Sequence, residues 1–390
     1  MEKCQRLRAR KVQPQELLAV HSQHHVQMYG RSSSRKTAPE KRAVETPSGM
    51  FKKLQCGGIG IDADTYWNDV TSQAAKMAAG CVIQLAEDVA AGTVKNGFAL
   101  VRPPGHHAMH NQAMGFCYFN NVALAAKALL NKPNVNKVMI VDWDIHHGSG
   151  TQQVFYDNPA VLVVSLHRFD DSQFFPGTGR PEEIGNGAGT GYNVNIAFSG
   201  QRIQNGSHFP SCCGDTEYLA AFRSVVLPLA LDFQPDIILV SAGFNATEGH
   251  PPTLGGYSVS PECYAHLTRF LMTVCNGKVV MALEGGYELR SLCASAEACM
   301  MALLGDDIPA LEETALKNTP NPAAVESIQK TVAFLLPTWK RLHVSKNLIP
   351  VSHFQAHCGM KDMEALAALS SLSVQDDTRS QGNASSSTIV

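Results

Sequence analysis

Five short, uniformly apolar runs separated by helix-length segments are the feature that most constrains the fold of this 390-residue chain. The apolar runs are GFALV (97–101), KVMIV (137–141), AVLVVSL (160–166), DIILVSA (236–242) and KVVMAL (278–283). Segments with helical periodicity cover 71–91, 119–131, 216–232 and 261–275. Strands this apolar are buried on both faces, and helical crossovers join parallel neighbours. We therefore predict an α/β fold whose central, mostly parallel sheet carries helices on both faces.

Local signals refine two of these helices. Ser260 is a typical N-cap residue, Pro261 suits the first helical position, and Gly277 can end the helix that they begin. Pro228 lies inside another predicted helix. Because proline lacks an N–H group, we expect it to kink that helix.

Every apolar run is followed by polar residues. The sequences that follow are RPPGHH, DWDIHH, HRFDD, GFNATEGH and EGGY. Parallel strands deliver such exits to one edge of the sheet, where ligands bind in folds of this kind. A satisfied structural network, a metal site and a catalytic centre are three competing interpretations, and five converging exits favour chemistry.

Asp144 and His146 are the strongest candidates for metal ligands. They stand two positions apart just past a predicted strand, so extended geometry points both side chains to the same side. A carboxylate and an imidazole suit Zn²⁺, which in catalytic sites takes three protein ligands and leaves one position open. Asn245, after a neighbouring strand, is the best-placed third candidate.

Residues suited to proton transfer follow other strands. His106 and His107 come after a stiff RPPG turn, and a histidine with a pKa near neutrality can accept and return a proton. Asp142 can orient one of the imidazoles, and Tyr287 can donate a hydrogen bond to a developing oxyanion. Together these groups predict hydrolysis of an amide by a metal-activated water.

Composition excludes several classes of function. The net charge is -2 and charged residues make up 17% of the chain, which argues against direct nucleic-acid binding. No run approaches the roughly 18 apolar residues of a membrane span. The 11 cysteines are too sparse for a secreted disulfide scaffold, and the polar start MEKCQRLRARK has no signal-peptide core, so we expect a reducing compartment.

Several long motifs in order resemble the zinc-dependent histone deacetylase family, which has the three-layer arginase/deacetylase fold. They are RPPGHHA, GFCYFNNVA, VDWDIHHGSGTQQ, SLHRFDD with FFPGTG, and EGGY, and the resemblance covers most of 10–343. Segments 56–70 and 295–305 are similar to class IIa members. The resemblance implies acetylated lysines of histones or other proteins as substrates, corepressor complexes as partners, and a location in both nucleus and cytoplasm.

Carried onto this sequence, the resemblance assigns roles to individual positions. It makes His107 the general base and acid, His106 its electrostatic neighbour paired with Asp142, and Tyr287 the carbonyl-polarising phenol. The implied zinc ligands are Asp144, His146 and Asn245. The implied substrate-binding residues are Asp64, Phe116, Phe175 and Gly286, with the two phenylalanines walling a narrow channel for the lysine stem. A buried monovalent cation, K⁺, is implied at Asp142, Asp144, His146, Ser165 and Leu166.

Three positions depart from the family pattern. The family's third ligand is an aspartate, so Asn245 removes one negative charge from the metal shell, and we expect zinc affinity to fall. Tyr287 matches the strongly active classes, whereas vertebrate class IIa enzymes carry histidine there. Ser149 replaces an acidic or amide residue near the second histidine, which leaves the orientation of His107 less well defined.

The sequence predicts one catalytic domain over 1–343, with a mobile loop at 31–49 and the family's first strand missing. The ligands of a structural zinc that would include Cys56 are expected to be lost with that strand, and Cys4 is a spare thiol. Segment 200–215 is longer than the family's loop. The region 344–390 is expected to be a flexible tail with a hydrophobic nuclear export segment at 363–374.

Three hypotheses about function remain open from the sequence. The first is a zinc-dependent protein lysine deacetylase acting in transcriptional repression. The second is a catalytically weak or inactive acetyl-lysine-binding scaffold that recruits corepressors, which Asn245 favours. The third, a polyamine or small-amide hydrolase on the same fold, needs acidic groups deep in the channel to which the sequence does not clearly point.

Overall fold

The structure, a computed structural model, describes residues 3–30, 52–53, 59–61, 65–199, 201–204, 207–210 and 213–357. Its centre is a six-stranded sheet in which every pair of neighbouring strands is parallel. In spatial order the strands are β4 (Gly97–Ala99), β11 (Val279–Leu283), β10 (Ile237–Ala242), β5 (Val138–Asp142), β6 (Val161–Arg168) and β7 (Asn193–Phe198). The prediction of an α/β fold is confirmed, and all five apolar runs form strands of this sheet.

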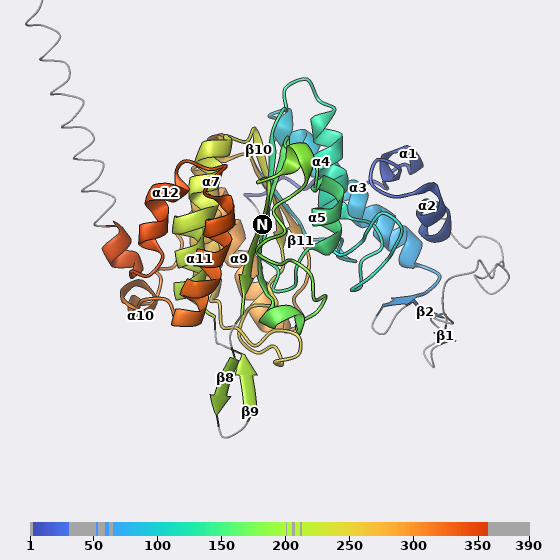
Figure 1. Cartoon of the computed structure of the whole chain (residues 1–390). Coiled ribbons are helices and arrows are strands. Elements are labelled where there is room, and N and C mark those ends of the chain that lie inside the picture. The colour runs from blue at the N-terminus through green and yellow to red at the C-terminus, as the bar shows by residue number, and fades with distance from the viewer. Residues whose placement is uncertain are drawn as a thin grey trace, which may run out of the picture.

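Side chains alternate between the two faces of the sheet, as the period of a strand requires. On β5, Met139 and Val141 belong to one apolar core, whereas Val138 and Ile140 belong to the other. Helices α3 (Thr71–Ala90) and α4 (Asn121–Leu130) cover one face. The opposite face is covered by α6 (Asp215–Ala221), α7 (Leu227–Phe233), α8 (Pro261–Met272), α9 (Leu289–Leu304) and α11 (Pro322–Leu335). Figure 1 shows the resulting three layers.

The predicted start of the helix at Ser260 is confirmed, but α8 ends at Met272, and Gly277 belongs to a separate 3₁₀ turn over Cys275–Gly277. The Ser260 hydroxyl accepts a hydrogen bond from the backbone N–H of Cys263 at 3.0 Å, and Pro261 is the first residue of α8. The helix containing Pro228 is interrupted by a π-helical turn over Phe222–Val226 between α6 and α7. Because Pro228 has no N–H, the carbonyl of Ser224 instead accepts a hydrogen bond from the Ser345 hydroxyl at 2.7 Å.

The other elements surround this framework. The short helices are α1 (Pro14–Leu17), α2 (Gln23–Tyr29), α5 (Ser149–Phe155), α10 (Glu313–Lys317) and α12 (Leu342–Ser345). A small antiparallel sheet contains β1 (Lys52–Lys53), β2 (Ile59–Gly60) and β3 (Tyr66–Trp67). Within the long segment at 200–215, β8 (Gln201–Gln204) and β9 (Ser207–Pro210) pair as an antiparallel hairpin.

The packed chain continues past residue 343, where a tail was expected to begin. Ile349 and Ala356 are buried, and the guanidinium of Arg223 donates to the backbone carbonyl of Leu348 at 3.1 Å and to that of Val351. The predicted loop at 31–49 and the export segment at 363–374 lie outside the described residues. Among the helices that are described, we find none with the length and apolarity to cross a membrane.

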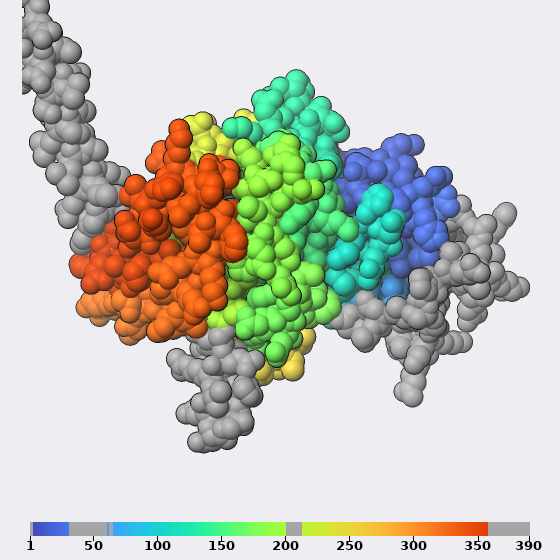
Figure 2. All heavy atoms as spheres, viewed as in Figure 1, coloured from blue at the N-terminus to red at the C-terminus, as the bar shows by residue number. Residues whose placement is uncertain are grey.

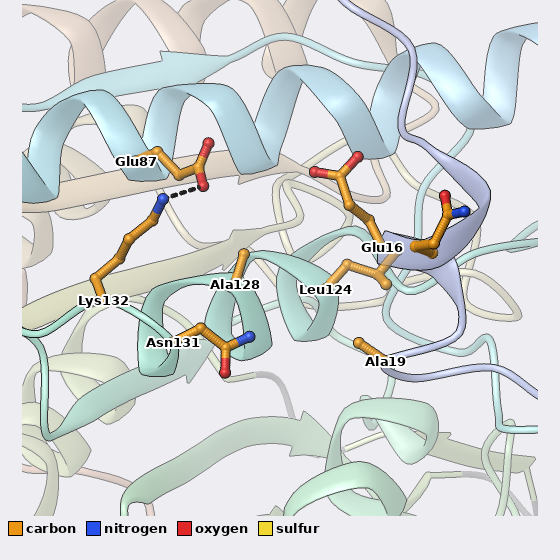
Figure 3. A pocket seen from close by; sticks show the side chains of 8 residues that line it. Glu16, Ala19, Glu87, Leu124, Ala128, Asn131 and Lys132 are labelled. Carbon is orange, nitrogen blue, oxygen red and sulfur yellow. Dashed lines mark ion pairs between the residues drawn. The ribbon is translucent and has the colours of Figure 1, made fainter.

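The N-terminal and C-terminal helices lie on opposite sides of the body, coloured blue and red in Figure 2. A hollow of about 330 Å³ lies where α1, α3 and α4 meet, and Figure 3 shows its lining. An ion pair between Glu87 and Lys132, with 2.7 Å between nitrogen and oxygen, spans one side of it. None of the residues predicted for the functional site lines this hollow.

Candidate functional site

The carboxyl ends of the central strands bring the predicted site residues together. In the register of the sheet, Asp142 on β5 is level with Ser165 on β6 and with Ser241 on β10. Asn245 follows β10 by three residues, and Glu284 directly follows β11. Side chains from four segments far apart in sequence therefore meet at one edge of the sheet, as the sequence indicated.

The three predicted metal ligands form one buried cluster. His146 Nδ1 lies 3.1 Å from Asp144 Oδ1, and Asn245 Nδ2 lies 2.7 Å from the same oxygen and 3.1 Å from His146 Nδ1. The other carboxylate oxygen of Asp144 accepts from the backbone N–H of Gly285 at 2.9 Å. A Cβ atom at Gly285 would lie 2.4 Å from Asn245 Nδ2, so only glycine allows this approach.

The orientation of the Asn245 amide decides whether this cluster suits a zinc ion. Its oxygen accepts a hydrogen bond from the backbone N–H of Ile145 at 2.8 Å, which leaves the amide nitrogen facing Asp144 and His146. An amide N–H group is a donor and cannot bind a cation. Within the described residues, no group of three His, Cys, Asp or Glu side chains is arranged to hold a metal. As arranged, the residues present do not fit a zinc with three protein ligands.

His106 is buried beside three carboxylates. Its Nδ1 lies 2.9 Å from Asp142 Oδ2, and its Nε2 lies 3.9 Å from Asp144 Oδ2. Burial alone would lower the pKa of His106, but the negative charges of Asp142, Asp144 and Glu284 raise it to about 10. In this arrangement His106 is a cation paired with Asp142 at neutral pH.

His107 lies on the same turn in a different electrostatic environment. Burial first, and then the charge of neighbouring His106, hold the pKa of His107 well below its usual value, so this ring is neutral. Its ring centroid lies 5.2 Å from that of Phe175 in a T-shaped contact. Among the described residues, its buried Nδ1 has no hydrogen-bond partner, and neither does the buried hydroxyl of Ser149. The serine hydroxyl therefore does not orient this imidazole.

Tyr287 and the two phenylalanines lie at the outer side of the cluster. The centroid of the Phe116 ring is 5.9 Å from that of Tyr287, and that of Phe175 is 6.0 Å from His146. Tyr287 is 41% exposed and Phe175 is 38% exposed, so both can meet a ligand. Gly286, with a positive φ of 133°, turns the chain just before Tyr287.

The remaining predicted residues are placed as follows. Ser165 and Leu166 are buried on β6, and the Ser165 hydroxyl lies 2.9 Å from Nδ1 of His167. Asp142 is the neighbour of Ser165 in the parallel register. Asp64, predicted at the rim, and Cys56, predicted for a structural zinc, both lie outside the described residues.

Two residues that hold the site in place were not predicted. One carboxylate oxygen of Glu284 accepts from the backbone N–H groups of Gly105 at 2.6 Å and His106 at 3.1 Å, which ties the histidine turn to the end of β11. Burial raises the pKa of Glu284 to about 7. Nε2 of His250 accepts from the backbone N–H of Tyr287 at 2.8 Å. The motifs EGGY and GFNATEGH contain these two residues. A polar segment after a strand, however, does not show which of its side chains form hydrogen bonds with backbone groups.

The sequence profile of the histone deacetylase domain matches residues 1–303. The chain belongs to the histone deacetylase family. It is 51% identical over 335 residues to histone deacetylase 9 of Homo sapiens and 48% identical over 376 residues to histone deacetylase 7 of the same species. It is also 48% identical over 358 residues to histone deacetylase 4 of Caenorhabditis briggsae. These three relatives are class IIa members, so the predicted class IIa character is confirmed.

These alignments cover 85%, 95% and 90% of this chain, which spans only 32%, 39% and 39% of the three relatives. A solved structure, the crystal structure of the HDA15 HD domain, is 39% identical with a TM-score of 0.74. That similarity covers 87% of this chain and 83% of the solved one. The predicted arginase/deacetylase fold is thereby confirmed. The family is zinc-dependent in general, whereas the amide of Asn245 turns its nitrogen toward Asp144 and His146 in this chain.

Proposed function

We propose that this chain is an acetyl-lysine-recognising domain of the histone deacetylase family that turns its ligand over slowly and contributes to transcriptional repression by recruiting corepressor complexes. The observation that carries the proposal is the amide of Asn245, which directs a donor toward Asp144 where a metal needs an acceptor. The aromatic and proton-handling residues around it are retained. Recognition is therefore better supported than catalysis.

The chain's own residues suit an acetylated rather than a free lysine. The rings of Phe116 and Phe175 offer apolar surface to the methylene stem, and Tyr287, a partly exposed residue, has a hydroxyl that can donate to the acetyl carbonyl. His107 is buried and neutral beside cationic His106. A charged ammonium group would have to give up its hydration between these apolar rings, whereas the neutral acetamide does not.

The second candidate function is zinc-dependent hydrolysis of the acetyl amide. Retention of a neutral His107, the His106–Asp142 pair and Tyr287 favours it, because these groups can accept a proton and stabilise an oxyanion. In the family, zinc supplies the activated water. Since the amide of Asn245 does not fit that ion, the first candidate is preferred.

Further proposals follow from the family resemblance. We propose histone tails as the source of the acetylated lysine, nuclear and cytoplasmic locations, and export through 363–374. A K⁺ ion would be held by Asp142, Asp144, His146, Ser165 and Leu166, of which Asp142 and Ser165 are register neighbours on β5 and β6. The names of the relatives, histone deacetylases 9, 7 and 4, support the choice of substrate class.

Calorimetry on the full chain tests the proposal with a histone-tail peptide carrying either acetyl-lysine or lysine. We expect the acetylated peptide to bind at least about tenfold more tightly, and Phe175→Ala to weaken it by roughly 1–2 kcal/mol because apolar surface is lost. Equal affinity for both peptides would exclude acetyl-lysine recognition. Mass spectrometry of the same mixtures measures turnover, and rapid loss of the acetyl group would favour the second candidate instead.

A further inference from the structure

The amide nitrogen of Asn245 lies between two side chains of the cluster, 2.7 Å from Asp144 Oδ1 and 3.1 Å from His146 Nδ1. We infer that in this chain the amide nitrogen takes over the structural role of the metal, so that the site keeps its shape without one. The inference deepens the proposed function, because a site built without metal can recognise acetyl-lysine without hydrolysing it.

Two contacts fix the direction of the amide independently. The backbone N–H of Ile145 is a donor, so the group 2.8 Å from it must be the amide oxygen. The Asp144 oxygen is an acceptor, so the group 2.7 Å from it must be the amide nitrogen. Turning the amide over would place N–H against N–H at Ile145 and oxygen against oxygen at Asp144. Both contacts therefore resist the orientation that a metal would require.

An aspartate at position 245 would not face this conflict. A carboxylate has two acceptor oxygens, so one can accept from Ile145 while the other binds a metal. Asparagine has one oxygen, which faces the N–H of Ile145, so its amide nitrogen is the group that faces Asp144 and His146. The substitution therefore does more than remove a charge, because it also turns a donor toward Asp144 where aspartate would offer an acceptor.

The charge of Asp144 is already balanced by protein donors in the described structure. One oxygen accepts from Asn245 and from the backbone N–H of His146 at 2.9 Å, and the other accepts from Gly285 at 2.9 Å. Nε2 of His106 lies 3.9 Å from the second oxygen. A carboxylate with this many donors does not need a cation to be stable in the interior.

Zinc content and thermal stability of the full chain test the inference without any ligand. After dialysis against EDTA, we expect the wild type to keep its Tm, to gain nothing from added zinc and to hold far less than one zinc per chain. Asn245→Asp should be less stable than the wild type after EDTA, because two carboxylates then face each other, and zinc should restore it. Asn245→Asp should also bind zinc more tightly than the wild type. The gain should exceed roughly 10- to 100-fold, which is the loss in affinity expected when only a residue that orients a metal ligand is removed.

Asn193→Asp is the matched control. Asn193 on β7 is also buried, and its amide donates to the side-chain oxygen of Gln152 at 2.7 Å. This variant should lose stability that zinc does not restore. One tightly held zinc per wild-type chain, with a Tm that falls in EDTA, would overturn the inference. So would an Asn245→Asp variant as indifferent to zinc as the wild type.

Binding of the acetylated peptide to EDTA-treated wild type separates this inference from the proposed function. If the metal-free protein keeps its stability but binds no acetylated peptide, the proposed function fails and the structural role of Asn245 stands. If it binds the peptide only after zinc is added, the inference fails and acetyl-lysine recognition stands.

Discussion

The carboxylate of Glu284 holds the histidine turn against the sheet, and replacing it should loosen the site before it unfolds the protein. One of its oxygens accepts from the N–H groups of Gly105 and His106, and the other accepts from the hydroxyl of Ser241 at 3.2 Å. Glu284→Leu keeps much of the volume but leaves both backbone N–H groups buried and unpaired. Glu284→Gln keeps an acceptor of similar reach and serves as the conservative variant.

The expected magnitude follows from these contacts. An unpaired buried donor costs about 1–3 kcal/mol, so two of them lower the free energy of unfolding of Glu284→Leu by about 2–6 kcal/mol. Above pH 7, where the carboxylate is charged, Glu284→Gln should lose about 1–2 kcal/mol, because its hydrogen bonds are no longer assisted by that charge. A typical domain has about 5–15 kcal/mol to lose, so the glutamine variant stays folded even where the leucine variant is marginal.

Glu217 provides a matched control away from the site. It is similarly buried and also accepts from two backbone N–H groups, those of Gly214 at 2.9 Å and Asn321 at 3.0 Å. Urea unfolding should therefore show comparable losses for Glu217→Leu and Glu284→Leu. Only Glu284→Leu should weaken binding of the acetylated peptide, and Glu284→Gln should largely restore it. If both leucine variants bound peptide equally well while folded, Glu284 would have no positioning role.

Two further predictions concern histidines. Nε2 of neutral His21 accepts a hydrogen bond from the N–H of Asn120 at 3.0 Å, and burial lowers the pKa of His21 from 6.5 to about 3. The unfolded chain therefore binds this proton more tightly than the folded chain does. The stability that is present above pH 6.5 is lost as the pH falls. Urea unfolding at pH 5.5 should show a free energy of unfolding roughly 1.4 kcal/mol lower than at neutral pH because of this residue. The His21→Gln variant should not show this loss. An unchanged pH dependence in that variant would contradict the assignment. In Ser149→Asn, the longer side chain should contact the unpaired Nδ1 of His107 and tighten peptide binding by about 0.5–1.5 kcal/mol. Ser149→Thr is the control, because threonine is no longer than serine in the direction of its hydroxyl. Equal affinities of the two variants in calorimetry would count against this prediction.

Much of the sheet could be predicted because its strands are continuous apolar runs buried on both faces. Strand β7 could not, since its sequence NVNIAF has asparagines at 193 and 195. Both are buried, and both donate to the side-chain oxygen of Gln152, so tertiary contacts supply what the pattern lacks. A polar residue in a strand is hidden from sequence periodicity when its partner lies elsewhere in the chain.

The sequence predicted which segments form the candidate site, but not how all of its side chains are oriented. Polar residues after parallel strands identified which segments meet, because the topology fixes that meeting point. The direction of the Asn245 amide could not be foreseen, since it depends on the N–H of Ile145, 100 residues away in sequence. The supporting roles of Glu284 and His250 were equally hidden, because both bind backbone groups that carry no residue-specific signal.

The interruption of the helix before Pro228 ties the end of the described chain to the core. The carbonyl of Ser224 depends on the hydroxyl of Ser345, and the largely buried guanidinium of Arg223 depends on carbonyls beyond residue 347. A recombinant fragment that stopped at residue 343 would leave the guanidinium of Arg223 without these acceptors. It would also leave the carbonyl of Ser224 without the hydroxyl that donates to it. The folded domain therefore needs the segment through Val351, because that segment supplies both the acceptors for Arg223 and the donor for the carbonyl that Pro228 leaves without a helical partner.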